Sequence, residues 1–124
     1  MDAHPRNVVL PMVVVLALLM SAFVLVPQEA TALVDGDYEY ELTGDPEVAM
    51  ITAYTGAGGD ISIPSTLGGY PTAIIRYEAF NRAAGYHVTS VLVPNSVHTI
   101  QNYAFANCDQ LVTAYIGSGV SSLG

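Results

Sequence analysis

Lysine is absent from this 124-residue sequence, and three arginines are its only strongly basic residues. Eleven Asp and Glu residues bring the formal net charge to -8. A protein that follows nucleic-acid phosphates needs clustered Lys and Arg side chains to release counterions, so this charge argues against a nucleic-acid partner. The lack of lysine also excludes a P-loop, a Schiff-base enzyme and a Ser-Lys catalytic dyad.

Cysteine occurs once, at Cys108, which excludes a disulfide within the chain. Small exported domains usually compensate for a small core with paired cysteines, and the stacking of repeated units is another source of stability. No His or Lys lies near Cys108 in the sequence to activate its thiol. We therefore expect Cys108 to be a buried, unreactive packing residue.

Motifs for catalysis and metal binding are also missing. The chain has no Gly-x-Ser-x-Gly, His-Glu-x-x-His or Cys-x-x-Cys sequence, and its three histidines, His4, His87 and His98, lack the spacing of metal ligands. Residues 56–60 resemble a single calcium-binding nonapeptide that does not recur, so we interpret them as a loop. We expect no enzyme activity, no metal site and no cofactor. We interpret six carboxylates as a solvated acidic face: Asp35, Asp37, Glu39, Glu41, Asp45 and Glu47.

A charge-free apolar run covers residues 8–26 and follows Arg6. The triplet Ala30-Thr31-Ala32 fits the small-x-small pattern before a signal-peptidase cut, which makes Leu33 the first mature residue. The run is long for a signal-peptide core and barely long enough to span a membrane. Residues 1–32 are therefore predicted to be a signal peptide or an uncleaved signal anchor. Both alternatives place residues 33 onward outside the cytoplasm, in a secreted or cell-surface protein.

A β-hairpin is predicted over residues 38–54. Residues 38–43 alternate Tyr or Leu with Glu, which is the period of a half-exposed strand. Residues 44–47 read Gly-Asp-Pro-Glu, a turn, and residues 48–54 resume an apolar strand. We expect this hairpin to form an N-terminal cap over residues 33–57.

The remaining sequence repeats itself. Residues 75–80 match residues 100–105, which places two Ala-Phe pairs 25 positions apart. The strand-like segment at 61–63 recurs at 91–93 and again at 114–116. A period of 23 to 25 residues lies in the leucine-rich-repeat range, in which each unit buries its apolar face only by stacking on its neighbours.

The repeat pattern resembles that of BspA-like leucine-rich-repeat proteins. The residues that carry the resemblance are Val93-Pro94, Val97, Ile100, Ala104-Phe105, Cys108 and Leu111. The lead-in at residues 51–69 also looks like the opening of such an array, so the likeness covers roughly residues 38–124. It implies a surface protein of a microbe, with adhesion or surface interaction as its function. The first unit departs from the pattern because it has no cysteine and no leucine after Phe80.

We therefore expect a β-rich leucine-rich-repeat solenoid over residues 58–124, with about two and a half units. Each unit has a strand such as residues 88–93 ended by Pro94, a second short strand such as residues 97–100, and a helical or 3-10 turn at residues 103–105. Two inserts in the first unit, residues 68–71 and 82–86, are expected to be loops. The array stops where another Ala-Phe turn is due, which indicates a truncated frame or part of a longer array.

One face of the stacked strands is the candidate binding site. In each unit the large aliphatic residues are assigned to the inside, namely Ile61, Ile63, Val91, Val93, Ala114 and Ile116. The residues between and beside them then point outward in one continuous face. This predicted face consists of Asp60, Ser62, Ser90, Leu92, Thr113 and Tyr115.

The leading functional hypothesis is an exported module that binds a protein or a surface polymer and performs no catalysis. One alternative is a structural stalk or envelope component without a discrete ligand. Another is the non-catalytic N-terminal part of a larger exported enzyme. The membrane enters these hypotheses only through an uncleaved N-terminal segment.

Overall fold

A computed structural model describes residues 32–124 of the chain. The predicted signal segment, apart from Ala32 at its end, lies outside the described residues. The described residues form a β-solenoid of about three turns with almost no helix. Its fold class is the one that the repeat pattern predicts.

Three antiparallel strands make up the N-terminal end of the solenoid. Strand β2 (Tyr38–Thr43) pairs with β3 (Val48–Tyr54), and this confirms the predicted hairpin. A short strand that the sequence did not predict, β1 (Leu33–Asp35), adds to the outer edge of β2. The alternation in β2 also holds, because Tyr38 and Tyr40 are buried while Glu41 is exposed.

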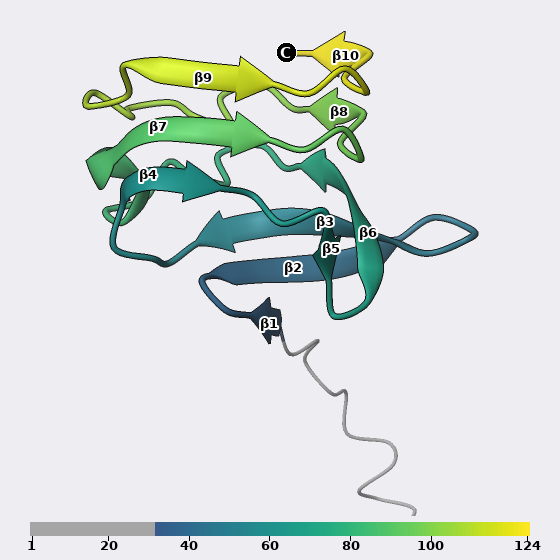
Figure 1. The fold of residues 1–124 in the computed structure, drawn as a ribbon. Helices are drawn as coiled ribbons and strands as arrows, with labels where there is room; N and C mark the ends of the chain where they lie inside the picture. The colour runs from purple at the N-terminus through teal and green to yellow at the C-terminus, as the bar shows by residue number, and fades with distance from the viewer. Residues whose placement is uncertain (1–31) are drawn as a thin grey trace, which may run out of the picture. The chain divides into compact units, whose positions relative to one another are not determined.

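Two parallel sheets form the sides of the coils (Figure 1). The first continues from β3 through β6 (Tyr70–Ile75) and β8 (Thr99–Ile100) to β10 (Ser122–Leu123). The second contains β4 (Gly59–Ser62), β7 (Val88–Val93) and β9 (Thr113–Ile116). Each coil therefore contributes one strand to each sheet, as expected for a stacked repeat.

The expectation that residues 68–71 form a loop is wrong. Strand β5 (Thr66–Leu67) pairs antiparallel with the start of β6, with Thr66 opposite Pro71 and Leu67 opposite Tyr70. Gly68 and Gly69 make the turn at φ values of +58° and +87°, a region that glycine enters without steric cost. The sequence predicted the turn at Gly68 and Gly69 correctly, but strand pairing continues on both sides of it, beginning with the fully buried Leu67.

The other insert contains a 3-10 turn, η1 (Gly85–His87), directly before β7. The helical or 3-10 turn expected at residues 103–105 is a hydrogen-bonded turn without helix. Tyr103 has a φ of +59° and its counterpart Glu78 has +57°. A right-handed helix cannot continue through this left-handed conformation, which explains the difference.

Aliphatic and aromatic columns run through the core. Ile51, Ile75 and Ile100 are aligned on neighbouring strands and are almost completely buried. Beside them the rings of Tyr54 and Phe80 stack with centroids 5.2 Å apart. The ring of Phe80 in turn stacks on that of Phe105, which confirms that the two phenylalanines occupy equivalent positions. Phe105 is only partly buried, since no coil of the described chain covers its other side.

Cys108 is partly buried against this core, in agreement with its expected packing role. Its thiol lies 3.6 Å from the carbonyl oxygen of Phe80, within the range of a weak hydrogen bond. Burial raises the pKa of the Cys108 thiol, and the negative charge of Asp109 adds to the effect. The fraction of Cys108 that is present as the reactive thiolate at neutral pH is therefore reduced.

Candidate binding face

The sheet of β4, β7 and β9 brings the predicted site residues into register. Ser62 pairs with Leu92 across β4 and β7, and Leu92 pairs with Tyr115 across β7 and β9. In the same way Asp60 aligns with Ser90, and Ser90 aligns with Thr113. Two rows of three side chains therefore cross the sheet, as the repeat offsets predict.

Burial agrees with the assigned orientation in the first two coils. Ile63, Val91 and Val93 are buried, whereas 46% of the surface of Leu92 is exposed. In β9 the outward Tyr115 is 63% exposed. The inward assignment of Ala114 and Ile116 does not produce burial, because in the described chain no further coil lies against β9.

The apolar end of the face is hollowed. Leu92, Tyr115 and Ile116 line a depression of about 440 Å³ together with the turn residues Pro94, Asn95 and Gly117. Its rim is ordered by Asn95, whose side-chain oxygen accepts a hydrogen bond of 2.9 Å from the backbone N–H of Ser118. An aliphatic side chain and a tyrosine beside fixed backbone polar groups are the chemistry of a protein-binding anchor.

The opposite end of the face is polar. Asp60 is exposed, and its carboxylate accepts a hydrogen bond of 3.1 Å from the hydroxyl of Thr89. Ser90 and Thr113 are only half-buried. One end of the face therefore carries a carboxylate and hydroxyl groups, and the other end, two residues further along the strands, is apolar.

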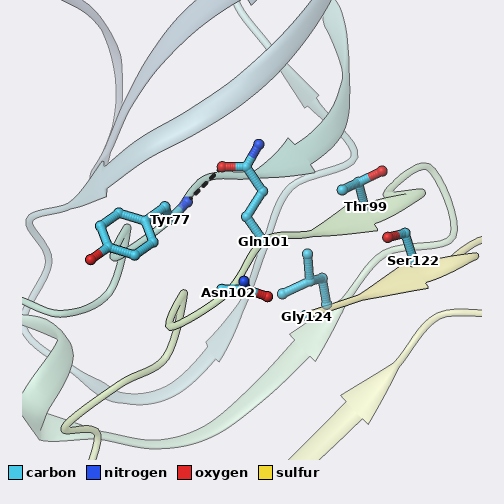
Figure 2. Close-up of a pocket in the computed structure, with 7 residues that line it drawn as sticks. Tyr77, Thr99, Gln101, Asn102, Ser122 and Gly124 are labelled. Atoms are coloured by element: carbon cyan, nitrogen blue, oxygen red, sulfur yellow. Dashed lines mark hydrogen bonds between the residues drawn. The ribbon is translucent and has the colours of Figure 1, made fainter.

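A second hollow, which the sequence did not reveal, lies beside the other sheet (Figure 2). Its volume is about 340 Å³, and it is lined by Tyr77, Thr99, Ile100, Gln101, Asn102, Ser122 and Gly124. The side-chain oxygen of Gln101 accepts a hydrogen bond of 2.9 Å from the backbone N–H of Tyr77. This bond joins successive coils.

Tyrosine is also prominent near that hollow. The rings of Tyr77 and Tyr103 meet edge to face with centroids 5.9 Å apart, and both side chains are at least half exposed. The sequence shows eight tyrosines but does not distinguish packing residues from surface residues.

Within residues 32–124 no group of three or more His, Cys, Asp or Glu side chains is placed to hold a metal ion. His87 and His98 are both exposed, as expected for loop or surface residues. In the same part of the chain there is no helix of the length and apolar character needed to cross a membrane.

Several solved bacterial structures are similar to the described fold. A leucine-rich-repeat protein of T. pallidum superposes with a TM-score of 0.66 and 27% identity, covering 75% of this chain and 42% of its own. A leucine-rich cell-surface protein of Faecalibacterium prausnitzii gives a TM-score of 0.61 and 36% identity, covering 77% and 26%. A leucine-rich-repeat protein of Bacteroides capillosus gives 0.62 and 26% identity, covering 76% and 71%.

The chain therefore spans less than half the length of the first two of these structures. No protein-family model and no curated protein sequence matches it. The agreement between the fold of residues 32–124 and these solved structures confirms the resemblance that the repeat pattern carries.

Proposed function

We propose that this chain, a leucine-rich-repeat protein similar to the BspA-like surface proteins, is an exported module that binds a protein or a surface polymer through the face of β4, β7 and β9. The observation that carries the proposal is the pairing of Leu92 with Tyr115 on adjacent strands. Both side chains are exposed although they lie side by side. An exposed apolar pair that carries a hydroxyl and lies beside polar residues is typical of an interface anchor.

The location of the protein belongs to the same proposal. The F. prausnitzii protein is described as a cell-surface protein, and the N-terminal apolar run of this chain is typical of an export signal. We therefore place residues 33–124 outside the cytoplasm, where adhesion is a suitable role. A non-catalytic module is favoured because the site offers contact area and hydrogen-bonding groups rather than a nucleophile beside a base.

The test compares two double variants of the exported chain. Leu92→Ser with Tyr115→Ser removes the anchor, while Val34→Ser with Tyr70→Ser removes two exposed apolar side chains from β1 and β6 as a matched control. Beads carrying each protein are assayed for adhesion to immobilised matrix proteins and mucin-type polymers. Adhesion should fall for the first variant only, with little change in either unfolding midpoint.

Three outcomes contradict the proposal. A collapse of stability in the first variant means that the two side chains are core residues. Unchanged adhesion means that this face is not the site. A lack of adhesion by the wild-type chain to every surface favours the alternative of a structural stalk.

A further inference from the structure

A third hollow lies on neither of the surfaces described above, at the turn that follows β6. Its volume is about 230 Å³. It is lined by Thr52 of β3 and by five residues of the turn, Arg76, Tyr77, Glu78, Asn81 and Arg82. None of them belongs to β4, β7 or β9, so this hollow is independent of the proposed binding face.

The arginines of residues 32–124 are concentrated at this hollow, although this part of the chain is acidic. Residues 32–124 contain nine Asp and Glu residues and only two arginines, Arg76 and Arg82. Both arginines line this one hollow.

The two guanidinium groups are available to a ligand. In the described part of the chain the one ion pair joins Arg76 to Glu41 at 3.8 Å, with both side chains about half exposed. Such an exposed pair contributes about 0–1 kcal/mol, so a ligand carboxylate can replace it at little cost. Arg82 is exposed at the rim of the hollow.

The neutral groups of the hollow are also mainly donors. The side-chain oxygen of Asn81 accepts a hydrogen bond of 2.8 Å from the amide of Asn107, which leaves the Asn81 amide nitrogen to donate. Glu78 is the one carboxylate in the lining. A hydrogen bond with Glu78 raises the pKa of the Tyr77 hydroxyl. The hollow therefore presents more donors than acceptors.

We propose that this hollow binds a carboxylate-bearing sugar residue of an acidic polysaccharide. Arginine forms paired, charge-assisted hydrogen bonds with carboxylates, and these are the strongest contacts the lining offers. The volume lies below the range of about 300–1,000 Å³ typical of pockets for drug-sized ligands, which suits one sugar ring. Asn81 and Thr52 also line the hollow, and amide and hydroxyl groups can bind ring hydroxyls.

A polymer fits better than an acidic peptide because of Tyr77. Its half-exposed side chain lines both this hollow and the one lined by Gln101 and Asn102 in Figure 2. The second hollow has amide and hydroxyl side chains and no charged side chain. A linear polysaccharide that places its acidic ring beside the arginines can therefore continue over the Tyr77 ring, whose apolar face suits a sugar's C–H groups, toward the amide and hydroxyl side chains of the second hollow.

Calorimetric titration of the full chain with trigalacturonic acid tests the proposal, with neutral galactotriose and a triglutamate peptide as comparison ligands. Trigalacturonic acid should bind, with an affinity that falls as salt is added. Arg82→Gln should weaken binding by about tenfold or more, the loss expected for a charge-assisted hydrogen bond. Tyr77→Ala should weaken it as well.

A matched variant separates the site from net charge. Gln110→Glu makes the protein more negative by the same amount as Arg82→Gln but lies on an exposed loop that does not line the hollow. It should change the affinity less than about twofold, since the new carboxylate is exposed, does not line the hollow and is screened by salt. Equal effects of the two variants would overturn the proposal. So would absence of binding, equal binding of galactotriose, or equal binding of the peptide.

Discussion

The rings of Phe80 and Phe105 stack with their centroids 4.6 Å apart and their planes inclined by 22°. The two residues are 25 positions apart in the sequence. The backbone follows the same ladder, because the N–H of Phe80 donates to the carbonyl of Ala104 at 2.8 Å. Stability of the coils therefore depends on contacts between neighbouring repeats.

Removal of a phenylalanine ring should lower the free energy of unfolding more at the centre of the aromatic column than at its end. Phe80 is fully buried between Tyr54 and Phe105, so Phe80→Ala should cost about 3–5 kcal/mol. Phe105→Ala should cost less, about 1–3 kcal/mol, because Phe105 is partly exposed. Urea unfolding measures both values. Equal losses would contradict the unequal burial of the two rings, and a loss below about 1 kcal/mol at Phe80 would show that the column does not hold the coils together.

The turn between β5 and β6 allows a test with adjacent glycines. Both have positive φ, but a Cβ on Gly68 would collide with the hydroxyl of Tyr40, whereas a Cβ on Gly69 meets no atom within 4 Å. The Gly68 N–H also donates to the carboxylate of Asp35 at 2.8 Å. Gly69→Ala should cost about 1–2 kcal/mol from backbone strain alone, and Gly68→Ala about 1–3 kcal/mol more. Thermal unfolding of the two variants checks the order, and a reversed order would refute the contact with Tyr40.

The thiol of Cys108 should react slowly in the native protein. Its pKa is raised by burial, so the thiolate fraction is low and labelling by a disulfide reagent should accelerate as the pH rises. Denaturation should increase the rate because it removes the protection. Rapid labelling of the folded chain at neutral pH, or dimerisation by a disulfide under mild oxidation, would contradict the packed position of this side chain.

Alkaline pH should weaken the N-terminal cap. Burial first, and then Tyr54 and Asp37, raise the pKa of Tyr38 from its ordinary value of 10.0 to about 12. The unfolded chain releases this proton near pH 10 while the folded chain keeps it, so stability is present below pH 10 and is lost as the pH rises toward 12. Tyr38→Phe should reduce this loss in unfolding experiments between these pH values. The same pH dependence of stability in Tyr38→Phe as in the wild-type protein would contradict a raised pKa of Tyr38. Tyr86→Phe, which changes an exposed tyrosine, is the control.

Export should leave Leu33 at the N-terminus. The predicted cut after Ala32 immediately precedes β1, so cleavage would leave the paired strand intact. N-terminal sequencing of exported protein checks the position. Intact Met1 in the membrane fraction would support the signal-anchor alternative, and intact Met1 in the cytoplasm would contradict export.

The features that recur from coil to coil were the ones best predicted from the sequence. The offsets of 23 to 30 residues gave the register of β4, β7 and β9, including the pairing of Leu92 with Tyr115. This works because aligned inward positions in successive coils must carry apolar side chains that stack in the core. The hairpin of β2 and β3 was predictable from its alternation for the same kind of local reason.

The sequence pattern did not predict structural features that occur only once in the described chain. Strand β1 is too short and too exposed to leave a period in the sequence, and its pairing depends on β2 being already placed. The hollow between Arg76 and Arg82 depends on a left-handed residue, Glu78, which no composition rule identifies. Both features arise from the three-dimensional stacking of unlike segments.

The antiparallel arrangement of β1 and β2 gives the solenoid a direction. Strands β3, β6, β8 and β10 of the first sheet are parallel from coil to coil, so a duplicated segment of 23 to 25 residues can insert among the coils and preserve the register. On the other side of β3 the reversed strand offers no equivalent position. Variation in length among relatives of this chain should therefore arise by duplication within the coils, while the segment from β1 to β3 stays single and constant in size.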